Sequence, residues 1–369
     1  MIETIIKNAG DLKQIAQKIY NGERLAIEDG VILYKSNNLP LLASLASFAK
    51  QRVSGNNVFF NRNFHIEPTN ICVFRCKFCS YRRKKSDKDA WDFDIPEMLD
   101  FCRKYAEKDI TEVHIVGGVH PHRDLHFYGE LIQKIKTILP NVHIKGFTAV
   151  ELDYMIRNAG YDIEQGLKIL KDYGLNSIPG GGAEIFNEDV RRKICGDKAP
   201  SQLWLQIHEL AHNVGLPSNA SMLYGHVESY EHRIDHLERL RQLQDKTGGF
   251  NAFIPLKYKN GNNSMSSIGE INTAEVMKNF AVCRLYLDNI EHIKSYWPML
   301  GKNTAQMALN FGADDVDGTI DDSTKIYSMA GSEEISPSMT VSEMIRFISS
   351  AGFTPVERDS LYNGIDINN

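Results

Sequence analysis

Short apolar segments alternate with longer amphipathic segments along most of the chain. Apolar residues at every second position predict strands, whereas apolar residues three or four positions apart predict helices. Eight strands are expected, at Phe64–Pro68, Glu112–Val116, Val142–Phe147, Asn176–Ile178, Asn219–Leu223, Ala252–Leu256, Glu291–Tyr296 and Asp314–Asp317. Helical stretches lie between most of them. This alternation predicts an α/β fold with a parallel sheet, and eight repeats predict a (β/α)8 TIM barrel.

The same pattern divides the chain into three parts. Residues 1–58 have helical periodicity and are expected to form an N-terminal extension. Residues 59–335 hold the eight repeats of the barrel. Residues 336–369 are expected to form one more helix and an irregular tail. Acidic residues and helical periodicity at the start of the chain argue against a signal peptide.

Three cysteines lie together directly after the first predicted strand. Cys72, Cys76 and Cys79 have the spacing Cys-x-x-x-Cys-x-x-Cys, which suits one small metal centre. A structural zinc ion needs four protein ligands, and an electron-transfer [4Fe–4S] cube takes four cysteines. Three thiolates therefore indicate a cube with one open iron that can bind a substrate or cofactor. A zinc site completed by a distant residue, a ferredoxin-like centre and buried thiols without a ligand are the alternatives.

The other cysteines are less suited to metal binding. Cys102 and Cys283 fall on apolar helical stripes and are predicted to be core residues. Cys195 follows in a predicted loop, where it is either a fourth ligand or a plain buried thiol. Six cysteines, of which three are clustered, indicate a reducing compartment and no disulfide framework.

Composition and charge narrow the function classes. Lys plus Arg is 42 and Asp plus Glu is 47, which gives a net charge of −5. This balance is not typical of a protein that binds nucleic acid or membranes, and no apolar stretch is long enough to span a bilayer. A cytoplasmic enzyme is expected. The basic run 82–85 is either a solvated loop or a site for anionic ligands or an acidic electron donor.

Glycines and polar side chains recur where the predicted strands end. Active sites of (β/α)8 barrels lie at this face. The residues that follow the second to eighth strands in this way are Gly117, Gly118, His120, His122, Thr148, Glu151, Gly180, Gly181, Gly182, Glu184, Tyr224, His226, Glu228, Lys257, Trp297 and Asp317.

The stretch His208-Glu209-Leu210-Ala211-His212 matches the His-Glu-x-x-His pattern of zinc peptidases. Glu228 or Glu231 would complete such a site. The same segment carries an apolar stripe typical of a helix that packs on a barrel, so a structural role is the alternative.

The cysteine triplet resembles the motif of the radical S-adenosylmethionine (radical SAM) superfamily, Cys-x-x-x-Cys-x-aromatic-Cys, with Phe78 as the aromatic residue. The resemblance implies a [4Fe–4S] cluster whose open iron binds SAM, which is cleaved to methionine and a 5′-deoxyadenosyl radical. It also implies SAM contacts for Phe78, Gly117, Gly118 and Glu184. The superfamily often has Glu after the Gly-Gly pair, where this chain has Val119.

Longer stretches, among them HIEPTNICVFRCKFCSYRR, IPGGGAEIFNEDVRRKICGDK and FGADDVDGT, are similar to the aminofutalosine synthase family of menaquinone biosynthesis. The similarity implies that SAM is a co-substrate. The adenosyl radical would add to the enol-ether double bond of 3-[(1-carboxyvinyl)oxy]benzoate. Aryl migration and loss of the carboxylate would then give 6-amino-6-deoxyfutalosine. The related dehypoxanthine futalosine cyclase, which abstracts hydrogen, and a simple electron carrier are the alternatives.

A small dicarboxylate substrate needs cations, polar donors and an aromatic wall. His292 and Lys294 alternate with Ile293 and are both predicted to face the barrel interior. The resemblance also implies a low-potential electron donor such as flavodoxin or ferredoxin, and a homodimer is possible. The substrate-binding candidates are Arg82, His120, Tyr224, His226, Lys257, His292, Lys294, Tyr296 and Asp317.

Overall fold

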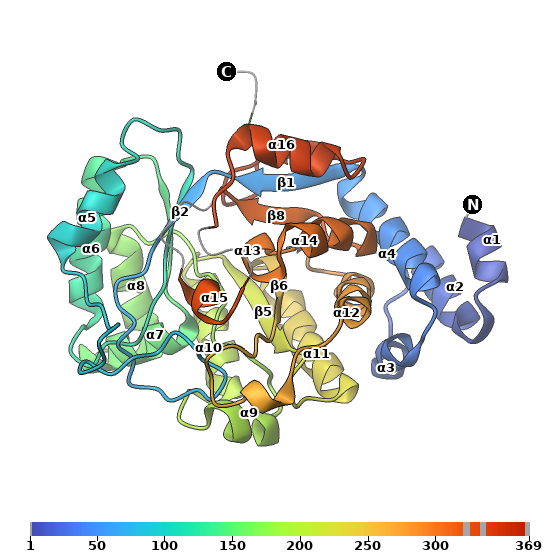
Figure 1. Ribbon diagram of the computed structural model, residues 1–369, viewed down its shortest axis with the longest axis horizontal. Helices are drawn as coiled ribbons and strands as arrows, with labels where there is room; N and C mark the ends of the chain where they lie inside the picture. Colours follow the sequence, from blue (N-terminus) through green and yellow to red (C-terminus); the bar gives the residue numbers. More distant parts are fainter. Residues whose placement is uncertain (1, 320–324, 333–336, 366–369) are drawn as a thin grey trace.

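The computed structural model describes residues 2–319, 325–332 and 337–365 (Figure 1). The strands are β1 (Asn57–Asn61), β2 (Asn63–Ile66), β3 (Glu112–Ile115), β4 (His143–Gly146), β5 (Ser218–Tyr224), β6 (Phe250–Lys257), β7 (His292–Ile293), β8 (Asp315–Gly318) and β9 (Thr354–Glu357). The helices of the first half are α1 (Ile2–Lys7), α2 (Lys13–Asn21), α3 (Ile27–Lys35), α4 (Leu39–Ser54), α5 (Ile95–Arg103), α6 (Leu125–Ile138), α7 (Ala149–Asn158), α8 (Ile163–Tyr173) and α9 (Glu188–Cys195). Those of the second half are α10 (Ser201–Asn213), α11 (Tyr230–Thr247), α12 (Thr273–Tyr286), α13 (Trp297–Leu300), α14 (Lys302–Ala308), α15 (Ile326–Met329) and α16 (Val341–Ser349).

Parallel strand pairs run all the way around a ring. β2, β3 and β4 pair in order, as do β5, β6 and β7, and β8 pairs with β1. Three bridges join these sheets, between Lys145 and Ser177, Ile178 and Ser218, and Lys294 and Asp315. β1 continues into β2 after one residue, which closes the ring. The predicted (β/α)8 barrel is therefore confirmed, although the strand expected at 176–178 forms only isolated bridges.

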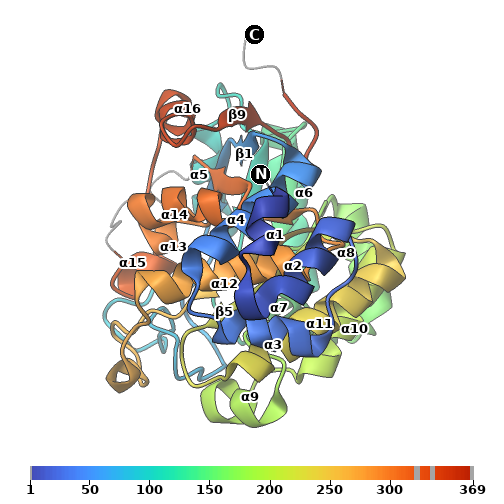
Figure 2. The same ribbon diagram turned by 90° about the vertical axis from the view of Figure 1, so that its right-hand side faces the viewer.

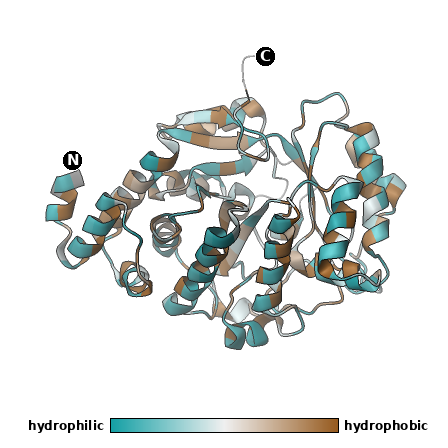
Figure 3. Ribbon diagram, turned by 180° about the vertical axis from the view of Figure 1, so that it is seen from behind, coloured by the Kyte–Doolittle hydropathy of each residue, from teal (hydrophilic) through white to brown (hydrophobic). Residues whose placement is uncertain are grey.

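The helices that surround the barrel follow from local sequence. α5 begins with a capping box, in which the Asp94 carboxylate accepts from Glu97 N–H and the Glu97 carboxylate accepts from Asp94 N–H. Its buried residues are Ile95, Met98, Leu99 and Cys102. The outer helices are hydrophilic on the solvent side and hydrophobic toward the strands (Figure 3). This two-sided pattern packs each helix on the barrel.

The strand register divides residues between two environments. His65 of β2 pairs with His114 of β3, which pairs with Lys145 of β4. The residues at the alternate positions of these strands, such as Val113 of β3 and Ile144 of β4, are buried among the apolar residues of the core. Because side chains alternate along a strand, the first set faces the barrel interior and the second faces the helices. The interior of this part of the barrel is therefore polar, whereas such barrels are usually filled by apolar layers.

Two strands were absent from the prediction. β1 falls where the helical extension was expected to end, and β9 falls in the tail that was expected to be irregular after its helix. β1 lies between β8 and β9, and Asn57 to Phe60 pair with Thr354 to Glu357. Neither strand has a strong alternating pattern, and each is stabilised by partners hundreds of residues away. β9 thus places the C-terminal segment in the barrel wall.

Helices α1 to α4 group at one side of the barrel (Figure 1) and lie in front of it when that side faces the viewer (Figure 2). α4 packs against α12, and α3 packs against α11. None of the described helices is long and apolar enough to cross a membrane. The division at residues 58 and 335 stays a prediction.

Candidate active site

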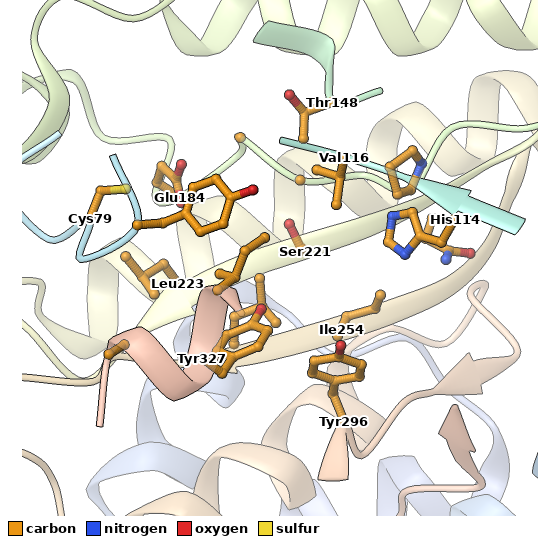
Figure 4. Close-up of a pocket in the computed structure, with 18 of the residues that line it drawn as sticks. Cys79, His114, Val116, Thr148, Glu184, Ser221, Leu223, Ile254, Tyr296 and Tyr327 are labelled. Atoms are coloured by element: carbon orange, nitrogen blue, oxygen red, sulfur yellow. The ribbon is translucent and has the colours of Figure 1, made fainter. Parts of the chain in front are cut away.

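A cavity of about 290 Å³ lies inside the barrel. Cys79 and Glu184 lie at one end, and His114 lies toward the other (Figure 4). Leu223 and Ile254 form an apolar wall between these ends. The cavity therefore has two chemically different ends, which we call the cysteine end and the inner end.

The loop that carries the three cysteines is anchored by main-chain hydrogen bonds. Val73 N–H donates to the Val119 carbonyl (3.0 Å) and Lys77 N–H donates to the Ile194 carbonyl (2.8 Å). Arg75 N–H donates to the Asp197 carboxylate (2.7 Å). The loop is thus held by the segment after β3 on one side and by the end of α9 on the other.

The cysteine end fits an iron–sulfur cube. Cys72, Cys76 and Cys79 are all partly exposed, and the N–H groups of Val119 and Phe74 bind the Cys72 sulfur. No three His, Cys, Asp or Glu side chains among the described residues surround a point where one metal ion could sit. A cube gives each thiolate a separate iron, so its three sulfurs lie farther apart than the ligands of a single ion.

Cys195 is close to this loop but less accessible. It is buried at the end of α9, and burial raises the pKa of its thiol to about 11. A negative charge on the Cys195 sulfur would raise the pKa of the Cys76 thiol, which is raised mainly by burial. The three thiols that are partly exposed are therefore the ones that the motif names.

The two glycines after β3 are required by the close approach of the cysteine loop. A Cβ atom at Gly118 would lie 2.4 Å from the Ile71 carbonyl oxygen, and one at Gly117 would lie 2.8 Å from the Thr69 carbonyl oxygen. Gly117 N–H donates to the Glu151 carboxylate (3.1 Å). Burial raises the pKa of Glu151 to about 7, against the opposing effect of hydrogen bonds from Thr148 and Gly117.

Glu184 lies beside the cysteine loop with a partly buried cation, Lys198. Its carboxylate accepts from Lys198 Nζ (2.6 Å), and the same ammonium lies 5.4 Å from the centre of the Phe78 ring. Glu184 has a φ of 50°, an uncommon conformation for a non-glycine residue that clusters at functional sites. The sequence prediction included Glu184 and Phe78 but missed Lys198, although the matched stretch contains it.

Four of the nine substrate-binding candidates line the cavity. Lys294 Nζ donates to the Asp317 carboxylate (2.6 Å) near the inner end, and Tyr296 forms part of the wall (Figure 4). Lys257 also lines the cavity and pairs with Glu270 (2.6 Å). These placements are compatible with substrate binding, which stays a prediction.

Four other candidates have partners outside the cavity lining. Arg82 Nε donates to the Cys72 carbonyl (3.2 Å), which places it behind the cysteine loop. His120 pairs with Asp92 (3.3 Å) in the loop after β3.

His226 pairs with Glu228 (3.1 Å). The ring of Tyr224 lies 5.3 Å from the Arg233 guanidinium.

His292 departs most clearly from the prediction. It pairs with Asp314 (3.0 Å) and stacks on Tyr362, with 3.7 Å between ring centres. His292 begins β7, so it lies nearer the N-terminal ends of the strands, where the C-terminal segment packs. Lys294, two residues later, reaches the cavity. The alternation was read correctly, but position along the strand separates the two side chains.

Several polar residues of the inner end were missed. His65, Glu112, His114 and Lys145 all line it. They occupy alternate positions with apolar residues in FHI, EVHI and HIKG. A polar residue at every second position of a barrel strand, with apolar residues between, was the pattern that pointed to a polar interior.

The His-Glu-x-x-His stretch has a structural role. His208 Nδ1 and His212 Nε2 both lie 2.8 Å from the Ser218 hydroxyl at the start of β5. Glu209 pairs instead with Lys246 (2.7 Å). The two imidazoles join α10 to the barrel wall, as the packing alternative predicts.

Models of two protein families match the chain. The model of the radical SAM superfamily matches residues 66–240. The model of the CofH/MqnC C-terminal region matches residues 247–369. Together they cover most of the barrel and the C-terminal segment.

The chain is also similar to individual proteins. It is 42% identical to an aminodeoxyfutalosine synthase of Thermus thermophilus, over 96% of this chain and 95% of that one. It is 41% identical to an aminodeoxyfutalosine synthase of Streptomyces coelicolor, over 96% and 94%. The structure of methylornithine synthase (PylB) resembles it with a TM-score of 0.74 and 17% identity, over 92% of this chain and 96% of that one, which supports the fold alone.

Proposed function

Because the chain belongs to the radical SAM superfamily, whose members use a [4Fe–4S] cluster and SAM, we propose that it is an aminodeoxyfutalosine synthase. The observation that carries this proposal is sequence identity of 42% and 41% to two such enzymes, each over 96% of the chain. The acceptor would be 3-[(1-carboxyvinyl)oxy]benzoate and the product 6-amino-6-deoxyfutalosine. A two-ended cavity suits this pair of substrates.

At the cysteine end, Cys72, Cys76 and Cys79 would hold three irons of the cluster and leave the fourth for SAM. When bound, the cluster supplies the electron that cleaves SAM. Glu184, from the loop after 176–178, would contact polar groups of SAM, and the 2.6 Å hydrogen bond from Lys198 supports this role because it orients the carboxylate. Gly117 and Gly118 let the chain pass close behind the cysteine loop.

In the middle of the cavity, apolar side chains would position the acceptor. Leu223, Ile254 and Tyr296 form a wall against which an aromatic ring can pack (Figure 4). Addition of the adenosyl carbon requires the alkene to be held at about 3–3.5 Å. A mainly apolar wall also keeps water away from the reactive carbon. The residues here therefore orient the acceptor and protect it.

The remaining predictions concern partners and location. An electron donor such as flavodoxin or ferredoxin is expected to dock near the cysteine loop, where Lys84 and Lys85 are exposed. Cytoplasmic location and a homodimer stay predictions from the sequence.

Mass spectrometry of the products tests the function. The anaerobically reconstituted enzyme would be incubated with SAM, dithionite and either the enol-ether benzoate or dehypoxanthine futalosine. We expect 6-amino-6-deoxyfutalosine from the first and no cyclised product from the second. Conversion of the second with release of 5′-deoxyadenosine would identify a cyclase instead. A cluster without any SAM-dependent product would indicate an electron carrier.

A further inference from the structure

Two buried lysines lie at the inner end of the cavity. Lys145 and Lys294 come from β4 and from the residue after β7, and they are 4% and 2% exposed. Lys145 Nζ donates to Glu112 (2.6 Å) and Lys294 Nζ donates to Asp317 (2.6 Å). Both lysines line the cavity. Buried ammonium groups that face an open cavity require an explanation, because burial of charge is costly.

The hydrogen-bond capacity of this end is only partly used. An ammonium group has three donors, and each lysine makes one hydrogen bond within the described part of the chain. The neighbouring His114 Nε2 is buried and has no hydrogen-bond partner among the described residues. Burial lowers the pKa of His114 well below its ordinary value, so the ring is neutral and can donate from one nitrogen. Spare donors on or next to three strands therefore line the same cavity.

The charges at this end balance one another. Lys145, Lys294 and the nearby Arg358 face Glu112, Asp315 and Asp317. The attraction for an anion therefore comes from oriented N–H donors, which need no reorganisation when an anion arrives, and not from excess positive charge. A planar group with two acceptor oxygens satisfies such donors better than a single hydroxyl does.

The C-terminal segment contacts carboxylates beside both lysines, Glu112 next to Lys145 and Asp315 next to Lys294. Ser360 Oγ donates to Glu112 Oε2 (2.6 Å), the oxygen that accepts from Lys145. Arg358 Nε donates to Asp315 Oδ2 (2.5 Å), whose other oxygen accepts from Asp317 N–H (2.6 Å). The segment thus contacts the partner of Lys145 directly and the partner of Lys294 through Asp315.

The geometry points to a carboxylate subsite at the inner end, formed by Lys145, Lys294 and His114 and positioned by the C-terminal segment. This subsite rests on the proposed function. It would bind the ring carboxylate of the acceptor at the inner end, and the alkene would then lie toward the cysteine end. The apolar wall between the two ends then receives the aromatic ring. The subsite selects acceptors that carry a carboxylate on the ring.

The test compares two acceptors that differ in one group. The natural acceptor carries a carboxylate on the ring. The analogue 2-phenoxyacrylate has the same enol ether with its side-chain carboxylate, but it has no carboxylate on the ring. With wild type we expect kcat/KM to favour the benzoate by about 10- to 100-fold, the range of one or two charge-assisted hydrogen bonds. In Lys294→Met and Lys145→Met, kcat/KM should fall at least about tenfold for the benzoate and change by less than about threefold for 2-phenoxyacrylate.

Lys50→Met is the matched control. Lys50 is also a buried lysine, but its ammonium lies 3.5 Å from the centre of the Phe353 ring, outside the cavity. The control should keep the wild-type preference. Because Lys145→Met leaves Glu112 unpaired, the double variant with Glu112→Gln serves if the single variant does not fold. Iron content and acceptor-free cleavage of SAM show whether each variant retains an intact cysteine end.

The outcomes separate this inference from the proposed function. Loss of the preference in the lysine variants alone supports the subsite. Wild-type preference in both folded lysine variants, with product still formed, would overturn the subsite and leave the function standing. No adenosylated product from either acceptor with wild type would overturn the function and the subsite together.

Discussion

The two ends of the cavity are built in different ways. The cysteine end is formed by one loop of eight residues, Cys72 to Cys79, and by the glycines and Glu184 beside it. The inner end is assembled from single side chains on separate strands, among them His65, His114 and Lys145. One end depends on local spacing and close backbone approach, whereas the other depends on the strand register of the whole barrel. Changes at the two ends should therefore affect different steps.

The largest effect is expected at the cysteines themselves. Replacement of Cys72, Cys76 or Cys79 by Ala would remove the proposed thiolate ligand of one iron, so turnover and SAM cleavage should be abolished while the barrel stays folded. Iron and sulfide analysis, circular dichroism and 5′-deoxyadenosine release measure this. Cys102→Ala, in the core, is the control. Full activity in any one of the three variants would refute the ligand assignment.

Gly118→Ala should be nearly as severe. Its Cβ would lie 2.4 Å from the Ile71 carbonyl oxygen, so the cysteine loop must move. Displacement by about 1 Å can cost about 100-fold in turnover. Iron content per chain and turnover are the measurements. Gly364→Ala, whose nearest contact would be 3.9 Å away, should have little effect. If both variants bind iron equally well, the close approach has no functional importance.

Glu184→Gln tests the SAM side of the comparison. Loss of the charge weakens one charge-assisted hydrogen bond, so KM for SAM should rise about tenfold while KM for the acceptor changes little. Glu209→Gln, on the solvent side of α10, is the control for removing a paired carboxylate. An unchanged KM for SAM would remove Glu184 from the SAM site.

Glu151→Gln should change how stability depends on pH. Burial raises the pKa of this carboxyl from 4.5 to about 7 in the folded protein. The protonated form stabilises the fold fully below pH 4.5, and this contribution is lost as pH rises through 7. Wild type should therefore lose about 1 kcal/mol relative to the Gln variant between pH 6 and pH 8. Urea unfolding of both proteins at the two pH values measures the free energy of unfolding of each. If wild type and the variant differ by the same amount at both pH values, the prediction is wrong.

Ser360→Ala should have the smallest effect, and it acts on the inner end. The hydrogen bond from Ser360 to Glu112 is lost, while Lys145 keeps its partner. We expect KM for the acceptor to rise about threefold and SAM cleavage to stay unchanged. Ser349→Ala, at an exposed position of α16, is the control. A matching rise in KM for SAM would place the defect elsewhere in the barrel.

The difference between the ends also explains what the sequence could predict. The cysteine triplet, Gly117 and Glu184 could be predicted as site candidates because short spacings in the sequence single them out, and Cys79, Gly117 and Glu184 line the cavity. The helix start at Asp94 was found for the same reason. His65, His114 and Lys145 were missed because only pairing between strands brings them together. Lys294 was found, but His292 was assigned to the same site because periodicity gives the direction of a side chain and not its depth in the barrel.

β1 and β9 were missed because their partners are distant in sequence. β9 pairs with β1 across almost 300 residues, and no local pattern encodes such a pairing. Residues that are polar inside a barrel also contradict the usual apolar filling, so a rule based on burial alone would place them outside.

The pairing of β1 with β9 has a consequence for how the chain folds. Until Thr354–Glu357 have been synthesised, one side of β1 has no strand to pair with and presents open N–H and C=O groups. Contacts between such distant residues are slow to form, and unpaired edges promote aggregation. A chain shortened before residue 354 is therefore expected to accumulate in inclusion bodies, even though every residue of the cysteine loop is present.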